Sequence, residues 1–247
     1  MNIALSGYGA MGKEIETAAR QRGHAVIFRF TSASPMPSAF PSVTPDCVID
    51  FSRASAVEAV VRSCASSRIP LVIGTTGWND RAEEILAPAR AAGIPLIYGS
   101  NFSVGAQVMF RLAAELARLL APHPQYDAAI HEVHHTRKKD APSGTALTIA
   151  RAVLSASDRK HAIRTQIGSD PLQPEELLIT SQRLGNVPGD HTLTFSSAED
   201  ELVLTHRAHS RSGFAVGAVI AAELLSGLTG IHRFDDIVFS HTSSQQS

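Results

Sequence analysis

The chain has few of the residues that mark several classes of protein. Only two cysteines occur in 247 residues, which excludes a disulfide framework, and Cys47 and Cys64 lack the spacing of a metal site. No apolar run reaches the roughly 18 residues that a membrane-spanning helix needs. A formal net charge of −1 offers no basic surface for general nucleic-acid binding. We therefore expect two buried thiols, no membrane and no nucleic-acid partner.

A charged and then apolar leader is also missing, because the first apolar strand begins almost at residue 1, and this predicts a cytoplasmic location. Hydrophobic residues make up 44% of the chain, which at this length suffices for one large core or two smaller ones. The composition is typical of a globular protein with one or two domains.

The first glycines form a compact pattern directly after an apolar run. Residues 3–5 lead into Gly7-Tyr8-Gly9-Ala10-Met11-Gly12, and a helical stretch follows at 13–22. In such a strand–turn–helix unit the first glycine permits the tight turn, the second lets the backbone approach a pyrophosphate, and the third lets helix and strand pack closely. The context favours a dinucleotide site over an unliganded βα turn.

Acidic side chains are missing where a dinucleotide site commonly has one. No Asp or Glu occurs between Glu16 and Asp46, although a carboxylate about 20 residues after the glycines would bind the adenosine ribose of NAD. Arg29, Thr31 and Ser32 stand there instead and can contact a ribose 2′-phosphate. The pattern favours NADPH and leaves NADH open as the cofactor.

Strands and helices then alternate through the first hundred residues. Buried strands are predicted at 46–51, 70–74 and 94–98, with helices at 54–67 and 80–92. This alternation predicts an α/β fold with a parallel, Rossmann-type sheet. The loops at 51–52, 74–77 and 99–102 would then lie on one rim with the glycines, although ordinary strand-end turns look the same in a sequence.

The pattern changes after residue 101. A long helix is predicted at 104–120, strands with alternating polar and apolar residues at 176–183, 192–196 and 202–208, and a returning helix at 214–225. We interpret residues 102–212 as an α+β domain with an open mixed sheet, and residues 1–101, completed by 213–247, as the dinucleotide-binding domain. The proline-rich stretch 34–45 is predicted to be an irregular surface loop.

Titratable and positive side chains gather in residues 134–139. His134 and His135 can change charge near neutral pH. Arg137, Lys138 and Lys139 carry fixed positive charge, of which Lys139 is expected to face solvent. A lone basic run would most simply be a solvated loop, but the paired histidines favour a binding site.

A helix start lies next to this cluster. Pro142 turns the chain, and Ser143 is a good N-cap for a helix at 144–154. The backbone N–H groups of Gly144 and Thr145 would stand at the positive end of that helix, where a carboxylate binds well. Together with the basic cluster, the helix start predicts a site for a small dianion.

The same segment contains a zinc-protease pattern, H-E-x-x-H, at 131–135. That chemistry requires a helix, but residues 126–133 carry β-branched and small side chains without a clear helical period, so a strand is predicted. In a strand, residues four apart lie roughly 13 Å from each other at a rise of about 3.3 Å per residue, which is too far to share one zinc ion. We expect no metal site.

In this region the chain resembles a known family. The runs HHTRK at 134–138 and DAPSGTAL at 140–147 look like the signature of the 4-hydroxy-tetrahydrodipicolinate reductases, formerly dihydrodipicolinate reductases, of lysine and diaminopimelate synthesis. Further matches come in the family's order, namely the glycine run at 7–12, Asp50-Phe51-Ser52, GTTG at 74–77, NFSVG at 101–105, and Ser210-Arg211 with Phe214-Ala215. The resemblance spans nearly the whole chain.

The resemblance implies a reductase that transfers hydride from NADPH or NADH to a planar, unsaturated cyclic dicarboxylate. His134 would protonate the resulting enamine and Lys138 would stabilise charge. His135 and the helix start at Gly144 and Thr145 would bind the substrate. The resemblance assigns cofactor contacts to Gly74, Thr75, Thr76, Gly99, Ser100, Asn101 and Phe102. It further implies a homotetramer that is built through the sheet of the second domain.

Two other functions fit parts of the same sequence. A catalytically silent, dinucleotide-sensing protein could share the fold, since a fold does not decide function. Such a protein would need only the glycine turn, so the histidine–lysine cluster favours the enzyme. An amino-acid dehydrogenase that reduces an imine is a second alternative, against which the dianion-sized basic cluster argues.

Overall fold

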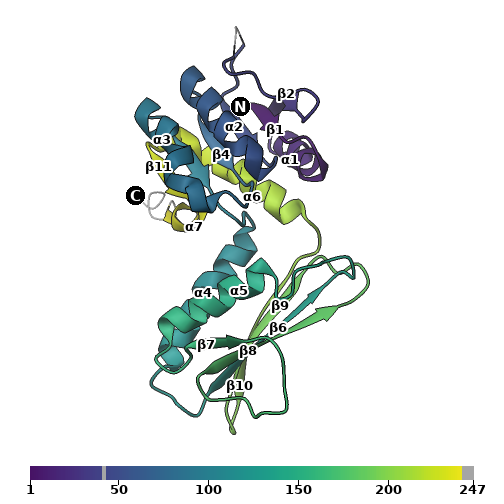
Figure 1. Ribbon diagram of the computed structural model, residues 1–247, viewed down its shortest axis with the longest axis vertical. Helices are drawn as coiled ribbons and strands as arrows, with labels where there is room; N and C mark the ends of the chain where they lie inside the picture. Colours follow the sequence, from purple (N-terminus) through teal and green to yellow (C-terminus); the bar gives the residue numbers. More distant parts are fainter. Residues whose placement is uncertain (41–42, 241–247) are drawn as a thin grey trace. The chain divides into compact units, whose positions relative to one another are not determined.

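The computed structural model describes residues 1–40 and 43–240, which fold into two compact units (Figure 1). Unit 1 comprises Met1–Val104 and the chain from Arg211 onward, and unit 2 comprises Gly105–Ser210. The predicted domain boundaries, at 101/102 and 212/213, lie within a few residues of these. None of the described helices is both long and apolar enough to cross a membrane.

A parallel sheet of six strands forms the centre of unit 1, in the order β11-β5-β4-β3-β1-β2. The inner strands are short apolar runs that are buried on both faces, as is usual where helices cover a parallel sheet on both sides. The strands are β1 (Asn2–Ser6), β2 (Ala25–Phe30), β3 (Cys47–Asp50), β4 (Leu71–Ile73), β5 (Leu96–Tyr98) and β11 (Ile231–Arg233).

Helices cover both faces of this sheet. α1 (Ala10–Gln21) and α6 (Ser212–Leu224) share one core cluster with the sheet, and α2 (Ala54–Ser67) and α3 (Ala82–Ala92) share a second. These layers are those of a doubly wound α/β fold. Cys47 and Cys64 are buried, free thiols in the two clusters, as predicted. Short pieces complete the unit: η1 (Asn79–Arg81), η2 (Leu225–Gly227) and α7 (Phe234–Ile237).

Unit 2 contains a mixed sheet of five strands, in the order β10-β9-β6-β8-β7. Both α4 (Val104–Leu120) and α5 (Gly144–Ala156) pack on one face of it, where Met109 and Ile149 meet Ile130 and Ile179 (Figure 1). β6 alternates exposed and buried residues, because its other side chains point to the open face. The strands are β6 (Asp127–His134), β7 (Ala162–Arg164), β8 (Glu176–Arg183), β9 (Asp190–Ser196) and β10 (Glu201–Arg207).

The predicted fold class, an α/β Rossmann-type sheet with a second, mixed sheet, is confirmed. One detail was wrong: the first helix begins at Ala10 instead of residue 13, because the turn needs only Gly7 to Gly9. β7, β11 and α7 were not predicted, since each has only three or four residues and shows no period in the sequence.

Candidate functional site

The turn between β1 and α1 has the geometry of a dinucleotide cradle. Gly7 has a φ of +88°, and a Cβ there would stand 2.3 Å from the carbonyl oxygen of Phe51. A Cβ on Gly12 would stand 2.6 Å from the carbonyl oxygen of Gly7, whereas a Cβ on Gly9 would meet no described atom within 4 Å. Glycine is therefore required at 7 and 12 for packing, and the space beside Gly9 is open to a ligand, so the residues present fit a dinucleotide.

A cavity of about 420 Å³ lies beside this turn. Gly7, Tyr8 and Gly9 line it, together with Thr31 and Ser32 from the segment after β2. Ala10 and Met11 form the first turn of α1 and lie outside the lining. No acidic residue of the described chain lines the cavity, so a phosphate on the ribose would meet no opposing charge there.

The lining also includes Ser52 from the predicted rim, and three side chains that sequence reasoning did not assign to the site: Pro35, Met36 and Arg53. The first two belong to the proline-rich stretch, which was predicted to be only an irregular surface loop. Ser52 and Arg53 follow β3; Ser52 belongs to the loop at 51–52 that was predicted on the rim with the glycines, whereas Arg53 was not singled out. Their position after a parallel strand was the signal available, since ligands bind at the carboxyl ends of such strands.

Arg29 does not line the cavity, because a carboxylate holds it. Its guanidinium donates two hydrogen bonds to Glu16, from Nε at 2.7 Å and from Nη2 at 2.5 Å. Glu16 is buried on α1, also pairs with Arg20, and accepts a 2.6 Å hydrogen bond from the Tyr8 hydroxyl. The hydrogen bonds from Arg29 are the main reason that the pKa of Glu16 is lowered to about 2. Arg29 also lies 5.7 Å from the centre of the Tyr8 ring.

The predicted cofactor residues after β4 follow the carboxyl end of that strand, which lies next to the carboxyl end of β3. In the described chain they do not line the cavity. Thr75 donates a 2.6 Å hydrogen bond to Asp50 and accepts one of 2.8 Å from the backbone of Ser52. A Cβ on Gly74 would clash with the Phe51 ring at 2.1 Å. Burial raises the pKa of Asp50. Thr75 therefore ties the ends of β3 and β4 together, and Thr76 follows it exposed.

The residues after β5 also have packing roles. Phe102 is buried and stacks on Phe234 with ring centres 4.6 Å apart, and a Cβ on Gly99 would stand 3.2 Å from Phe234. Asn101 accepts a 2.9 Å hydrogen bond from the backbone of Ser103, and Ser100 is exposed. None of the four predicted residues, Gly99 to Phe102, lines the cavity in the described chain.

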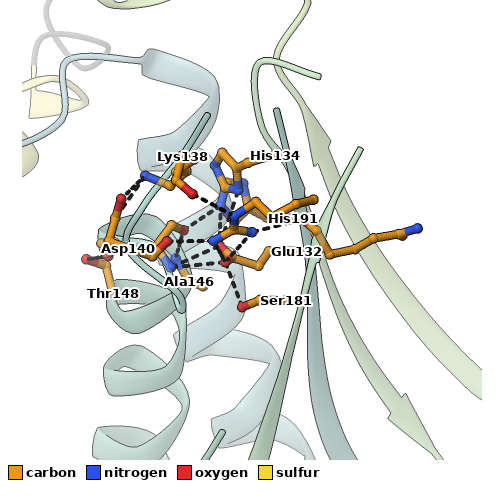
Figure 2. A network of polar contacts seen from close by, with 12 residues as sticks. Glu132, His134, Lys138, Asp140, Ala146, Thr148, Ser181 and His191 are labelled. Carbon is orange, nitrogen blue, oxygen red and sulfur yellow. Dashed lines mark hydrogen bonds and ion pairs between the residues drawn. The ribbon is translucent and has the colours of Figure 1, made fainter. Parts of the chain in front are cut away.

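In unit 2, a fully buried carboxylate stands at the centre of a polar network (Figure 2). Glu132 on β6 accepts hydrogen bonds from the backbone N–H of Ser143 at 3.1 Å and from the hydroxyl of Ser181 at 2.8 Å. The guanidinium of Arg183 lies 3.4 Å from its Oε1. Burial alone would raise the pKa of Glu132, but these hydrogen bonds lower it below its ordinary value.

Two imidazoles face the second oxygen of this carboxylate. Oε2 lies 3.5 Å from Nδ1 of His134 and 3.7 Å from Nε2 of His191 on β9. The two rings are 5.0 Å apart and nearly perpendicular. Burial lowers the pKa of His134, and Glu132 opposes this shift. Burial lowers the pKa of His191 to about 4, so this ring is neutral at pH 7.

The basic cluster continues in the turn after β6. Lys138 forms an ion pair with Asp140, with hydrogen bonds of 2.9 and 2.8 Å, and this contact lowers the pKa of Asp140. His135 is half-buried, and its Nδ1 has no hydrogen-bond partner in the described chain. Arg137 bonds Asn186, and Lys139 is exposed. The structure therefore brings Lys138 into the network of Glu132, through Asp140 and the neighbouring Arg183.

The predicted N-cap is confirmed at the start of α5. The Ser143 hydroxyl accepts a 3.1 Å hydrogen bond from the backbone of Ala146 and lies 3.1 Å from Nε2 of His191. The N–H groups of Gly144 and Thr145 have no hydrogen-bond partner in the part of the chain that the structure describes. A Cβ on Gly144 would meet no described atom within 4 Å, so this helix end is open to an anion.

The zinc-protease pattern lies on a strand, as predicted, since β6 contains residues 131–134. In the described chain, however, Glu132, His134 and His191 bring ligand-type atoms within 4.8 Å of one another. Because Arg183 already contacts the carboxylate and Lys138 lies nearby, positive charge opposes a cation there. We interpret the cluster as a hydrogen-bonded network, and the absence of a metal site stays a prediction.

Three residues of this network were not found by sequence reasoning: Glu132, Arg183 and His191. The signal for Glu132 was its position two residues before His134 in a strand, which places both side chains on one face. No local signal indicates Arg183 or His191, because sheet register brings them to β6, with His134 opposite Arg183 and Glu132 opposite His191.

Known proteins share both halves of this chain. Residues 1–102 match the family model of the dihydrodipicolinate reductase N-terminus, and residues 105–238 match that of its C-terminus. The 4-hydroxy-tetrahydrodipicolinate reductase of Christiangramia forsetii is 39% identical over 241 residues, which cover 96% of this chain and 98% of that protein. The enzyme of the same name from Myxococcus xanthus is 38% identical over 220 residues, covering 86% and 79%.

Solved structures share the fold. The dipicolinate-bound dihydrodipicolinate reductase from Paenisporosarcina sp. TG-14 superposes with a TM-score of 0.74 at 21% identity, covering 96% of this chain and 99% of that one. The glycine cradle agrees with an NAD(P)-binding N-terminal domain. The chain therefore belongs to the dihydrodipicolinate reductase family and is an NAD(P)-dependent oxidoreductase of lysine and diaminopimelate biosynthesis.

Proposed function

We propose that the chain reduces 4-hydroxy-tetrahydrodipicolinate, by way of dihydrodipicolinate, to tetrahydrodipicolinate in the cytoplasm. The observation that carries this proposal is the network of unit 2, in which one buried carboxylate joins a titratable imidazole to an open helix start. The substrate is a cyclic dicarboxylate whose dehydrated form is a planar, unsaturated ring, and the solved structure from Paenisporosarcina holds a cyclic dicarboxylate, dipicolinate. Positive groups and unpaired N–H groups are what such a dianion needs.

His134 is the proposed acid. Hydride addition to the conjugated ring leaves an enamine, which must accept a proton to give the product. A protonated imidazole can donate that proton, and the negative charge of Glu132 opposes the lowering of the His134 pKa by burial. The Nδ1 atom of His134 faces the carboxylate of Glu132, so the ring has a defined orientation.

Lys138 and His135 are the proposed partners of the reacting ring. The ammonium group of Lys138 would stabilise the negative charge of the substrate as the hydride arrives. His135 is half-buried and adjacent to the acid, where its ring would contact a carboxylate. Asp140 now pairs with Lys138, and a bound carboxylate would compete for the same ammonium.

The start of α5 is the proposed site for one substrate carboxylate. Gly144 and Thr145 offer two backbone N–H groups at the positive end of a helix of 13 residues. The absence of a side chain on Gly144 leaves space for the oxygens. Ser143 fixes this helix start by its N-cap bond to Ala146.

Unit 1 would hold the dinucleotide, which supplies the hydride when bound. The turn at Gly7 to Gly12 would contact the pyrophosphate, and Thr31 and Ser32 would contact the adenosine ribose or its 2′-phosphate. Arg29 would contribute positive charge next to the Tyr8 ring, while its guanidinium stays hydrogen-bonded to Glu16. We propose that two segments, Gly74 to Thr76 and Gly99 to Phe102, contact the nicotinamide end of the cofactor.

Cofactor oxidation tests the proposed function. Purified protein is mixed with substrate that the upstream aldol synthase makes freshly, and the absorbance of NADPH and NADH is followed in parallel. We expect rapid oxidation, with kcat/KM higher for NADPH because no carboxylate opposes a 2′-phosphate in the cavity. Equal values would mean that the missing acidic residue does not set the preference.

The same assay separates the alternatives. A silent dinucleotide sensor would bind NADPH, measured by fluorescence, and oxidise neither cofactor. An imine-reducing amino-acid dehydrogenase would leave the cyclic dicarboxylate unchanged but oxidise cofactor with a 2-oxo acid and ammonia. Either result would overturn the proposed substrate.

We further propose that the open face of the unit 2 sheet forms a homotetramer interface. Across this face the register aligns Leu178, Ala129, Thr194 and Val203 in one row. The side chains are apolar or small, and Val203 is 53% exposed on the edge-strand β10. Such an exposed, extended row supports association between copies of the chain.

Val203→Lys is expected to lower the mass of the assembly in solution, because a buried ammonium group in the proposed interface is costly. Light scattering after size-exclusion chromatography measures this mass. Leu119→Lys is the matched control, since Leu119 is 55% exposed but lies on α4. A mass that both variants leave at the wild-type value would contradict the proposed interface.

A further inference from the structure

We propose that Glu132 is a positioning residue that fixes His134 and the start of α5 relative to each other. One oxygen of its carboxylate faces Nδ1 of His134, and both oxygens accept the backbone N–H of Ser143. Both His134, the proposed proton donor, and the start of α5, the proposed carboxylate site, would then be held by the buried Glu132. This inference rests on the proposed function and adds a residue to it.

The two oxygens of Glu132 share the backbone N–H of Ser143 but differ in their other partners. Oε1 accepts the 2.8 Å hydrogen bond from Ser181 and lies 3.4 Å from Arg183. Oε2 faces the imidazoles, with Nδ1 of His134 at 3.5 Å and Nε2 of His191 at 3.7 Å (Figure 2). Because β8 supplies both side chains that contact Oε1, the sheet register helps to fix the carboxylate with Oε2 toward the imidazole.

The imidazole of His134 needs such an anchor on one side. Its Nδ1 is buried and has no hydrogen-bond partner in the described chain, so Oε2 of Glu132 is the acceptor toward which a proton on Nδ1 points. Closing the 3.5 Å distance by a few tenths of an ångström would make this a hydrogen bond. On the other side, Nε2 faces Gly189, where a Cβ would come within 2.9 Å. With Nδ1–H held by Glu132, Nε2 is the atom that carries the proton to the substrate.

The groups around His134 shift the pKa of its imidazole in both directions. Glu132 from β6 and Asp140 from the following turn raise the pKa of the imidazole. Burial, Lys138 and Arg183 lower it, and the neighbouring His191 is neutral at pH 7. Removing the negative charge of Glu132 therefore lowers the pKa of His134, and the protonated form is lost at a lower pH.

The same carboxylate holds the substrate end of α5. Ser143 is the N-cap of this helix, and its own N–H is bound to Glu132. Gly144 and Thr145 follow directly, so the two N–H groups proposed to bind a carboxylate are one and two residues from the anchored peptide. A shift of Glu132 would thus move the anion site and the acid together.

The pH dependence of kcat in Glu132→Gln tests the proposal. The amide oxygen keeps an acceptor for Ser143, but the negative charge is lost. We expect kcat at pH 7.5 to fall about tenfold or more and the falling limb of the profile to move to lower pH, with the KM for NADPH unchanged. Glu132→Asp should restore the position of the limb in part. Glu115→Gln, an exposed glutamate on α4 that is paired with Arg118, is the matched control.

A merely structural role would give another result. The kcat of Glu132→Gln would then fall by the same factor at every pH, with the limb in place, and this would overturn the proposal. Thermal unfolding and NADPH binding show whether the variant is folded. If it is not, the wild-type chain labelled with ¹⁵N-histidine decides, with the resonances of His134 assigned by their loss in His134→Gln. The neutral ring should carry its proton on Nδ1, and a proton on Nε2 would refute the role of Glu132.

Failure of the proposed function would be distinguishable. In that case the wild-type protein would not oxidise cofactor with the cyclic dicarboxylate. The ring tautomer of His134 would still report on Glu132, because it is measured without substrate.

Discussion

Replacing His134 with alanine is expected to lower kcat by about 10²-fold or more, which is the usual contribution of a general acid. The enamine that hydride addition leaves would then have to take its proton from water. Cofactor affinity should change little, because the glycine cradle belongs to unit 1 and His134 to unit 2. Steady-state kinetics with fresh substrate and NADPH fluorescence titrations measure the two quantities.

Since His134 is buried, the alanine variant leaves a cavity, and His134→Gln keeps most of the volume without the titratable ring. Both variants should lose activity to a similar extent. His123→Ala, which removes an exposed histidine after α4, is the control for the substitution itself. A wild-type kcat in either His134 variant would refute the role of the imidazole as the acid.

Gly189 offers an independent test of the same ring. A Cβ there would stand 2.9 Å from Nε2 of His134 and 3.6 Å from His191. Gly189→Ala should therefore displace the imidazole without removing it and lower kcat less than His134→Ala does.

The fold could be predicted where elements are long and periodic. α2, α4 and β8 have the predicted bounds, because ten or more helical residues, or eight alternating ones, give a clear period. The parallel sheet followed from apolar runs that alternate with helices. β11 has three residues and joins the sheet only through its pairing with β5, which nothing local in the sequence indicates.

The candidate site could be predicted only where it is local in sequence. His134, Lys138 and the N-cap Ser143 occur within ten residues, and the chemistry of each is visible in its residue type. Arg183 and His191 stand about 50 residues further on and reach Glu132 through strand register, which depends on the whole sheet. Glu132 was considered only as part of the zinc-protease pattern at 131–135, and it was not predicted as a site residue once that pattern was set aside.

Arg29 shows a second limit. Its position after the glycine turn suggested a free guanidinium for a 2′-phosphate, but Glu16 holds it with two hydrogen bonds. Glu16 lies one turn beyond Gly12 on α1, and only the packing of that helix against β2 brings the two charges together. The sequence shows both residues and cannot show their pairing.

Lys138→Ala is expected to lower kcat by about 10²-fold as well, because the variant lacks the charge that would stabilise the substrate during hydride addition. The pH profile should distinguish it from the Glu132 variant. Lys138 lowers the pKa of His134, so its removal raises that pKa, and the falling limb of kcat should move to higher pH. Kinetics at closely spaced pH values measure the shift.

Lys139→Ala is the matched control for Lys138→Ala, since the neighbouring ammonium is exposed and no contact with Glu132, His134 or Asp140 is found for it in the described chain. Lys138→Arg should keep part of the activity, because it retains the charge but places it in a wider, planar group. Asp140→Asn removes the carboxylate that pairs with Lys138, and it should lower the KM for the dicarboxylate if the ion pair competes with substrate. Equal losses in Lys138→Ala and Lys139→Ala would mean that only the total positive charge of the turn matters, and the specific role of Lys138 would fall.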